Sequence, residues 1–294
     1  MSSLSGVLPL DKAVGPTSHG LVASIRRAAG TRKVGHAGTL DPFASGLLLL
    51  LLGSATRLSE YLLGMDKVYE AVVHVGVETD SHDVDGQIVS EDSGWAEVSP
   101  AELEAALEPL RGSILQRPPV FSSKKVQGEP AHRRVRRGET VELDPVEVMV
   151  HELEITRIAL PECHLRVRCS SGTYIRALAR DMGLNLGVGA HLTALRRTEI
   201  GPFSVSSAQP LDAYPSPEEI RRDLISPGAA LAHLPTLAID GDEASRIRQG
   251  QFLPVGGRDI PEQTPIRVLL DGELVAVAGR QGEEIRPRKV LADG

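Results

Sequence analysis

Residues 35–52 read GHAGTLDPFASGLLLLLL, in which a glycine-rich polar segment runs directly into six consecutive leucines. A short apolar run of this length predicts a fully buried strand or the start of a buried helix. The polar segment holds one carboxylate, Asp41, among small residues that allow another backbone to approach closely. Pro42 disfavours the helical conformation at Asp41, so we expect this carboxylate to project from a loop anchored to a core element.

The segments on either side predict an α+β fold. Residues 6–10 are expected to form a strand, and residues 19–29 a helix with Ser18 as its N-cap and Gly30 after its end. Residues 31–46 are expected to be irregular. Alternating and helical patterns predict further strands at 68–77, 87–90, 146–158 and 165–169, and further helices at 100–110, 174–184 and 217–224.

The chain is expected to form a large domain at residues 1–228 and a small, mostly β C-terminal domain at 237–294. Beyond residue 228 the apolar pieces are short and split by glycine and proline, as at 266–270 and 274–278. A chain of 294 residues that is 41% apolar and 24% charged can bury its own core. This composition excludes a disordered, collagen-like or disulfide-scaffold protein.

Membrane and disulfide classes are also disfavoured. The longest apolar run, residues 47–52, is much shorter than the roughly 20 residues that cross a bilayer. The N-terminus lacks the basic start of a signal peptide, so we expect a cytoplasmic protein with no membrane contact. Cys163 and Cys169 are the only cysteines and fall in one expected strand, so we expect buried thiols.

Charge is distributed unevenly along the chain. The formal net charge is −7, yet residues 111–138 hold eight lysines and arginines against Glu129 alone. Further basic residues gather at 26–33 and 166–197. Such stretches are typical of a polyanion-binding track, although three separate solvated faces that never meet remain the alternative.

Two local patterns imitate ligand-binding motifs but lack essential residues. Residues 30–35, GTRKVG, have the glycine spacing of a phosphate-binding loop, but the lysine and hydroxyl residue that must follow are missing. Residues 81–86, SHDVDG, imitate a calcium loop without its first carboxylate or its flanking helices. The nine histidines include no close pair at metal-ligand spacing. We therefore predict neither a metal ion nor a cofactor.

Residues 35–46 resemble the motif G-H-x-G-x-L-D-P-x-A-x-G of the TruB family of bacterial tRNA pseudouridine synthases. The resemblance continues, in the family's order and spacing, through DKVY at 66–69, TDSHDVDG at 79–86, SGTYIR at 171–176 and LRR at 195–197. It implies a catalytic core of the pseudouridine-synthase type on a mixed, largely antiparallel sheet, with a PUA-like C-terminal domain. It also implies an isomerase that acts on the T-arm of tRNA and converts uridine 55 to pseudouridine.

The resemblance also assigns roles to individual residues. By it, Asp41 is the catalytic aspartate, Tyr69 contacts the target base and Arg176 pairs with Asp41. The uridine pocket is completed by His36, Tyr174 and Leu195.

The chemistry fits these residue types. Breaking the bond from uracil N1 to ribose C1′ and rejoining through C5 requires a group that attacks or stabilises carbon, which a carboxylate can do without a metal. A nearby arginine favours the ionised carboxylate by lowering its pKa. We expect Asp83 to orient Arg176 from behind, and Tyr69 is one candidate for accepting the C5 proton. Attack at C1′, addition to the ring and a glycal route all remain open.

The basic segment at 111–138 coincides with an RNA-gripping insertion of the family. The resemblance implies that its side chains hold tRNA phosphates, which gives affinity without sequence choice. Residues 131–137, AHRRVRR, replace an aromatic-containing piece of the family's commoner pattern, so individual contacts cannot be carried over. The residues expected to contact the RNA backbone are Lys124, Lys125, Arg133, Arg134, Arg136 and Arg137.

Two alternatives remain open at this point. A tRNA-binding folding helper would need the basic track and a pocket for an extruded base, with catalysis secondary. A guide-RNA-dependent pseudouridine synthase subunit would need partner proteins. For the leading interpretation we predict a monomer with no obligate protein partner.

Overall fold

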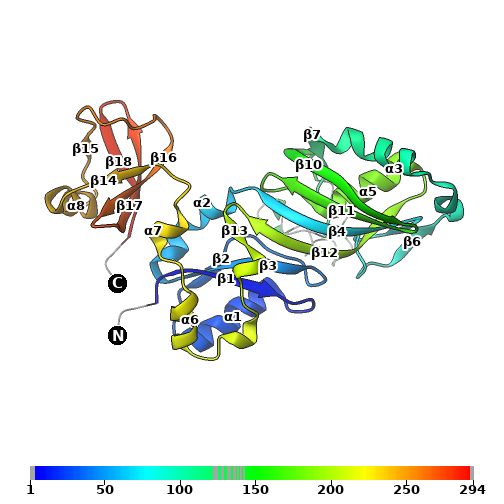
Figure 1. Cartoon of the computed structure of the whole chain (residues 1–294), viewed down its shortest axis with the longest axis horizontal. Coiled ribbons are helices and arrows are strands. Elements are labelled where there is room, and N and C mark those ends of the chain that lie inside the picture. The colour runs from blue at the N-terminus through cyan, green and yellow to red at the C-terminus, as the bar shows by residue number, and fades with distance from the viewer. Residues whose placement is uncertain are drawn as a thin grey trace. The chain divides into compact units, whose positions relative to one another are not determined.

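The computed structural model describes residues 4–121, 125–126, 129–130, 134, 137, 139, 141 and 143–291 (Figure 1). The chain forms two compact units. Unit 1 comprises Met1–Asp41, Leu47–Leu63 and Pro202–Gly294, and unit 2 comprises Pro42–Gly46 and Gly64–Gly201. Each unit is described separately below.

Unit 2 is built on an antiparallel sheet with the strand order β12-β4-β11-β10-β7, drawn from cyan to yellow-green in Figure 1. Ser45 and Gly46, which begin β3, pair in parallel with Arg196 and Arg197 of β12, so the pairing in unit 2 is mixed. The strands of this unit are β4 (Lys67–Val75), β5 (Val77–Thr79), β6 (Ile88–Glu91), β7 (Gly112–Gln116), β8 (Lys125–Val126), β9 (Glu129–Pro130), β10 (Val146–Ala159), β11 (Glu162–Cys169) and β12 (Ala190–Ile200).

Two helices of unit 2 pack against each other, and the second also contacts the sheet. Helix α3 (Pro100–Leu107) begins with a capping box, in which Ser99 and Glu102 bond each other's backbone N–H groups. Helix α5 (Ile175–Leu186) packs on β12 and is ended by Gly187 in the left-handed conformation. Short 3-10 helices occupy Ser93–Glu97 and Glu108–Leu110.

Unit 1 begins with a compact layer in which helix α1 (Ser18–Ala29) covers buried strands. Strand β3 (Ser45–Leu52) lies beside β1 (Gly6–Lys12) and pairs antiparallel with β2 (Val34–His36). The six leucines at 47–52 are at most 1% exposed, because residues on both faces of β3 are buried. This layer also contains α2 (Ser59–Leu63), α6 (Pro217–Asp223), α7 (Pro227–Ala230), the short strand β13 (Phe203–Ser204) and 3-10 helices at Gly53–Leu58, Val205–Ser207 and Leu211–Ala213.

The C-terminal part of unit 1 has its own five-stranded sheet, in the order β14-β16-β17-β18-β15, and its own apolar core (Figure 1, orange and red). Helix α8 (Gly241–Arg248) packs on this sheet through Ala244 and Ile247. The strands are β14 (Thr236–Ala238), β15 (Leu253–Pro254), β16 (Pro265–Leu270), β17 (Glu273–Gln281) and β18 (Glu284–Val290).

The structure confirms the α+β class, the largely antiparallel sheet and the β-rich C-terminal part. The predictions for residues 31–46 and 68–77 were wrong in detail. Residues 31–46 are not wholly irregular, because β2 pairs with β3. The strand expected at 68–77 is interrupted at Gly76, whose φ is 92° and where a Cβ atom would lie 2.3 Å from the Trp95 ring. Within the described residues, no helix is long and apolar enough to cross a membrane.

Candidate active site

The loop that leads to Asp41 is held by Ser18, at the start of α1. The Ser18 hydroxyl donates to the Leu40 carbonyl at 3.0 Å and accepts from the Leu40 N–H at 2.9 Å. Ser18 was predicted as the N-cap, which is wrong: Thr17 caps the helix by accepting from the Gly20 N–H. The Ser18 side chain is buried and fixes the peptide just before Asp41 instead. Asp41 itself is half-buried.

His36 ends strand β2 and lies opposite Leu50 of β3. The next residue continues the attachment, because the Ala37 N–H donates to the Leu49 carbonyl at 2.9 Å. The first residues of the glycine-rich motif therefore lie alongside the buried strand β3. His36 and Asp41 both belong to unit 1.

Gly46, at the end of the same motif, is required by a close approach of two backbones. A Cβ atom at this position would lie 2.2 Å from the Arg197 carbonyl oxygen, and φ at Gly46 is 102°. A residue with a side chain would be excluded both by this contact and by its backbone conformation. The motif glycine thus permits the pairing of Ser45 and Gly46 with β12.

Arg176 is buried in unit 2, where it donates to acceptors of Ser81, Asp83 and Phe121. Its Nη1 donates to the Ser81 carbonyl and to Asp83 Oδ2, each at 3.0 Å, and its Nη2 donates to the Phe121 carbonyl at 2.8 Å. Arg176 and Asp83 are each 5% exposed. The contact expected between these two side chains is therefore present. Buried ion pairs need such additional hydrogen bonds to offset desolvation.

The carboxylate of Asp83 is itself fixed by its own loop. Its Oδ1 accepts from the Ser81 hydroxyl at 2.6 Å and from the Asp85 N–H at 3.1 Å. The segment that imitates a calcium loop therefore folds as a turn around a guanidinium. In the part of the chain that is described, no group of three His, Cys, Asp or Glu residues is arranged to hold a metal ion.

Tyr174 precedes α5 and is held through its backbone by Gln116, the last residue of β7. The Tyr174 N–H donates to Gln116 Oε1 at 2.8 Å, and Gln116 Nε2 donates to the Tyr174 carbonyl at 3.1 Å. Gln116 is completely buried. Sequence reasoning missed it, because only the folded chain brings residues 116 and 174 together.

Tyr69 and Leu195 lie on one face of the sheet. Tyr69 of β4 is opposite Arg197 of β12, and Leu195 is two residues earlier on the same strand. Both side chains are 8% exposed. Lys67 shares this face, and burial, reinforced by the charge of Arg197, lowers its pKa to about 8.

Five of the seven residues predicted to form the site around the target base and its catalytic groups belong to unit 2. These are Tyr69, Asp83, Tyr174, Arg176 and Leu195, whereas His36 and Asp41 belong to unit 1. Their roles toward a nucleotide stay predictions.

Three described arginines of the basic segment are paired with acidic residues, whereas Arg117 is exposed. Arg111 donates to Glu104 and Glu108 at 2.6 and 2.5 Å. Arg134 and Arg137 share Glu139, at 2.6 and 2.8 Å. Lys124, Arg133 and Arg136 lie outside the described residues, as does the side chain of Lys125.

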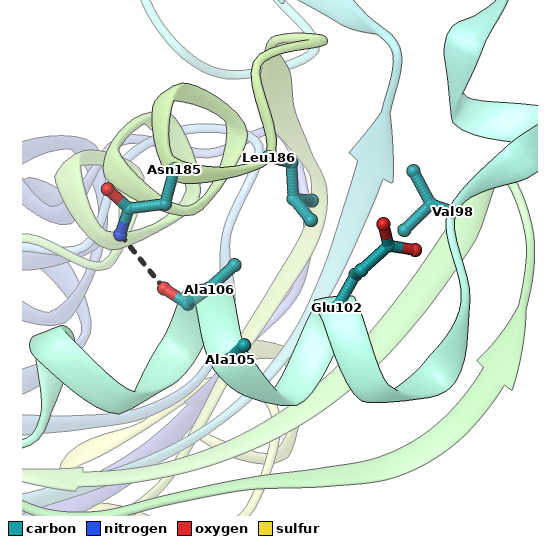
Figure 2. Close-up of a pocket in the computed structure, with 6 residues that line it drawn as sticks. All are labelled: Val98, Glu102, Ala105, Ala106, Asn185 and Leu186. Carbon is teal, nitrogen blue, oxygen red and sulfur yellow. Dashed lines mark hydrogen bonds between the residues drawn. The ribbon is translucent and has the colours of Figure 1, made fainter.

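A cavity of about 240 Å³ lies between α3 and α5 (Figure 2). Asn185 donates across it to the Ala106 carbonyl at 2.9 Å, and the Glu102 carboxylate bonds the Ser99 hydroxyl and N–H of the helix cap. The polar side chains that line the cavity thus bond to groups of the chain at the two helices. None of the predicted site residues lines this cavity. The lining residues are Val98, Glu102, Ala105, Ala106, Asn185 and Leu186.

Comparison with known proteins identifies two family models in the chain. Residues 26–175 match the TruB family pseudouridylate synthase N-terminal domain, and residues 176–216 match the tRNA pseudouridylate synthase B C-terminal domain. The proteins named tRNA pseudouridine synthase B from Thermobifida fusca and from Arthrobacter sp. are each 42% identical to this chain. The alignments cover 98% of this chain in both cases, and 98% and 97% of the two relatives.

Solved structures with a similar fold include chains from H/ACA assemblies. The crystal structure of the archaeal box H/ACA sRNP Nop10-Cbf5 complex contains a chain that is 28% identical, with a TM-score of 0.75. That alignment covers 99% of this chain and 87% of the other. An H/ACA RNP bound to a substrate RNA containing 2'-deoxyuridine gives 27% identity and a TM-score of 0.74, over 98% of this chain and 85% of the other.

Proposed function

The chain belongs to the TruB family of pseudouridylate synthases, and from this premise we propose that it converts uridine 55 in the T-loop of tRNA to pseudouridine. It is an isomerase of tRNA uridine, in agreement with its relatives named tRNA pseudouridine synthase B. The observation that carries the proposal is the 42% identity to these relatives over 98% of the chain. Position 55 follows from the resemblance of the motifs.

We assign the first chemical step to Asp41. The reaction breaks the bond between uracil N1 and ribose C1′, turns the ring and joins C5 to C1′, and the proton on C5 leaves as one is gained at N1. Atoms are conserved, so a single carboxylate that attacks or stabilises carbon is sufficient. The bond pair that Ser18 makes to Leu40 supports a fixed position for the peptide that precedes Asp41.

The remaining residues are proposed to hold the extruded base. Extrusion from the stacked loop costs a few kcal/mol, which stacking on the enzyme offsets. Tyr69 and Leu195 share one sheet face, which supports a common role against the uracil ring. His36 and Tyr174 complete the proposed pocket. Arg176 is proposed to keep Asp41 ionised, and Asp83 to orient Arg176, as their 3.0 Å contact supports.

Replacing Asp41 with Asn tests the catalytic assignment. We expect no pseudouridine in an unmodified tRNA transcript incubated with Asp41→Asn, while tRNA binding persists, because the amide keeps the shape but not the charge. The measurement is nucleotide-resolution mapping of pseudouridine, with a transcript carrying cytidine at position 55 as the substrate control. Pseudouridine formed by Asp41→Asn would overturn the assignment.

The same assay addresses the two alternatives. A folding helper without a catalytic role would give no product with the wild type. A guide-RNA-dependent subunit, as in the H/ACA assemblies, would give product only with guide RNA and partner proteins. We propose that the wild-type chain modifies bare tRNA as a monomer in the cytoplasm, with size-exclusion chromatography and light scattering as the check on oligomeric state.

We also propose that residues 1–228, with the insertion at about 111–138, act as the catalytic domain and that 237–294 form a PUA-like domain. The separate core of the C-terminal sheet supports the second boundary. Within the insertion, Arg134 and Arg137 are proposed to hold RNA phosphates, together with Lys124, Lys125, Arg133 and Arg136. A phosphate would replace Glu139 as the partner of Arg134 and Arg137.

A further inference from the structure

The chain reverses direction at His82, between the two residues that hold Arg176. The Ser81 carbonyl and the Asp83 carboxylate both face Nη1 of Arg176, at 3.0 Å each. Two acceptors from residues 81 and 83 converge on one nitrogen because the backbone turns at His82, whose φ of 59° is left-handed. The turn is closed by the His82 N–H, which donates to the Thr79 carbonyl, and by the His82 carbonyl, which accepts from the Leu192 N–H.

A histidine adopts this conformation more readily than most residues, but at a steric cost that glycine does not have. Glycine adopts left-handed backbone angles without steric cost, whereas a side chain crowds the following carbonyl. His82 therefore strains the backbone at a position where glycine would relieve it. Strained conformations of this kind persist where the surrounding structure over-determines them, and they are concentrated at functional sites.

The His82 ring lies in a cationic environment beside α5. Arg176 and Arg180 are four residues apart on this helix and so share one face. Arg180 is held there by Asp181, at 2.7 Å, and by the Arg117 carbonyl, at 3.2 Å. The Nδ1 atom of His82 is buried, and it has no hydrogen-bond partner among the residues that the structure describes.

This environment keeps the ring neutral. Burial lowers the pKa of His82 to about 4, and the charges of Arg180 and Arg176 act in the same direction, whereas Asp181 and the Thr79 carbonyl act against them. A neutral ring can lie beside two guanidinium groups without repelling either, whereas a protonated ring would repel both.

We propose that His82 is a positioning residue for Arg176. The His82 ring shields the Arg176–Asp83 pair from water and holds the guanidinium in the orientation that the reaction uses. The inference rests on the proposed function, in which Arg176 assists Asp41. His82 itself does not touch the nucleotide in this scheme. It acts through the left-handed turn and through the buried position of its ring, on which the charges of Arg176 and Arg180 act.

Two substitutions separate the ring from the turn. His82→Gly keeps the left-handed turn, relieves its strain and removes the ring. We expect it to unfold at the same or a higher denaturant concentration than the wild type, yet to form pseudouridine at least tenfold more slowly in single-turnover reactions, with unchanged tRNA binding. His82→Phe restores an uncharged ring, and we expect its rate to lie within threefold of the wild type.

The matched control is Val84→Gly in the same loop, because Val84 is 52% exposed and its removal should leave the rate unchanged. A wild-type rate for His82→Gly would overturn the inference. So would a His82→Phe rate as low as that of His82→Gly.

A readout that does not depend on catalysis is hydrogen exchange of the Arg176 guanidinium, followed by NMR. We expect exchange to be at least tenfold faster in His82→Gly than in the wild type and near wild type in His82→Phe. Equal exchange in all three proteins would overturn the shielding role. If the wild type forms no pseudouridine, the proposed function fails, while this exchange measurement still decides the role of His82.

Discussion

Arg176 and Arg134 each pair with a carboxylate of the chain, but the shorter ion pair is the weaker anchor. Arg134 lies 2.6 Å from Glu139, and the two side chains are 23% and 37% exposed. Arg176 lies 3.0 Å from Asp83, and each side chain is 6% exposed. Water and salt screen the first pair, whereas the second has no solvent to replace a missing partner. Burial, rather than the distance between the charged atoms, therefore decides whether an arginine keeps its carboxylate partner or can exchange it for another anion.

The largest expected effect comes from breaking the buried pair. Asp83→Ala removes the buried carboxylate that faces Nη1 of Arg176, so we expect the free energy of unfolding to fall by about 3–5 kcal/mol. Urea denaturation followed by circular dichroism measures this change. Asp85→Ala is the matched control, since its side chain is exposed, and it should change stability by less than about 0.5 kcal/mol. Equal effects of the two substitutions would contradict the comparison.

The second-largest expected effect is a dependence of stability on pH. It originates at His82, the residue next to Asp83 of the buried pair. The pKa of His82 is about 4 in the folded protein, against about 6.5 in the unfolded chain, so the unfolded state binds more protons between these values. Stability should therefore decrease as the pH falls from 6.5 towards 4, by about 2 kcal/mol after allowance for solvent screening of the half-buried ring. Burial also lowers the pKa of His74, helped by His191, and this adds to the same trend.

Comparison of unfolding curves at pH 7 and pH 4.5 for the wild type and His82→Phe isolates this contribution. The variant lacks the titrating group, so its curve should shift less over this interval. A shift as large as that of the wild type would place the pH dependence elsewhere.

The smallest expected effect on stability is at the exposed pair. Arg134→Ala and Arg137→Ala together should leave the denaturation midpoint within error of the wild type, because water replaces the arginines as the partner of Glu139. They should weaken tRNA binding and lower the slope of log affinity against log salt by about 0.7–0.9 for each phosphate that is no longer neutralised. Arg222→Ala is the control, as Arg222 is ion-paired with Asp223 on α6, outside the three basic stretches. An unchanged salt slope would refute the RNA contact.

Local sequence patterns predicted the elements whose residues decide their own conformation. The six leucines at 47–52, the Pro100 helix start and the glycine that ends α1 follow from neighbours in sequence. Strand β12 was not predicted, because its charged residues interrupt the alternation, and Arg197 is nevertheless 1% exposed in the sheet. The conformation of residues 190–200 is therefore set by their pairing with β4.

The candidate site was predictable to a similar extent. The contact between Arg176 and Asp83 was anticipated, since opposite charges in two matched motifs indicated a pair. The role of Ser18 was assigned wrongly, because both a helix cap and a distant peptide suit a serine at that position. Gln116, the Phe121 carbonyl and the turn at His82 depend on tertiary contacts that no local pattern contains.

The two bonds between Ser18 and Leu40 have a consequence for the timing of an entropic cost. A peptide that is immobilised when the chain folds loses its conformational freedom once in the lifetime of the molecule. A peptide that became ordered only around its ligand would lose that freedom at every turnover, and the loss would be subtracted from the binding free energy each time. Because the buried Ser18 fixes the peptide before Asp41, part of the entropic cost of ordering this loop is met when the protein folds. That part does not have to be met again each time RNA binds.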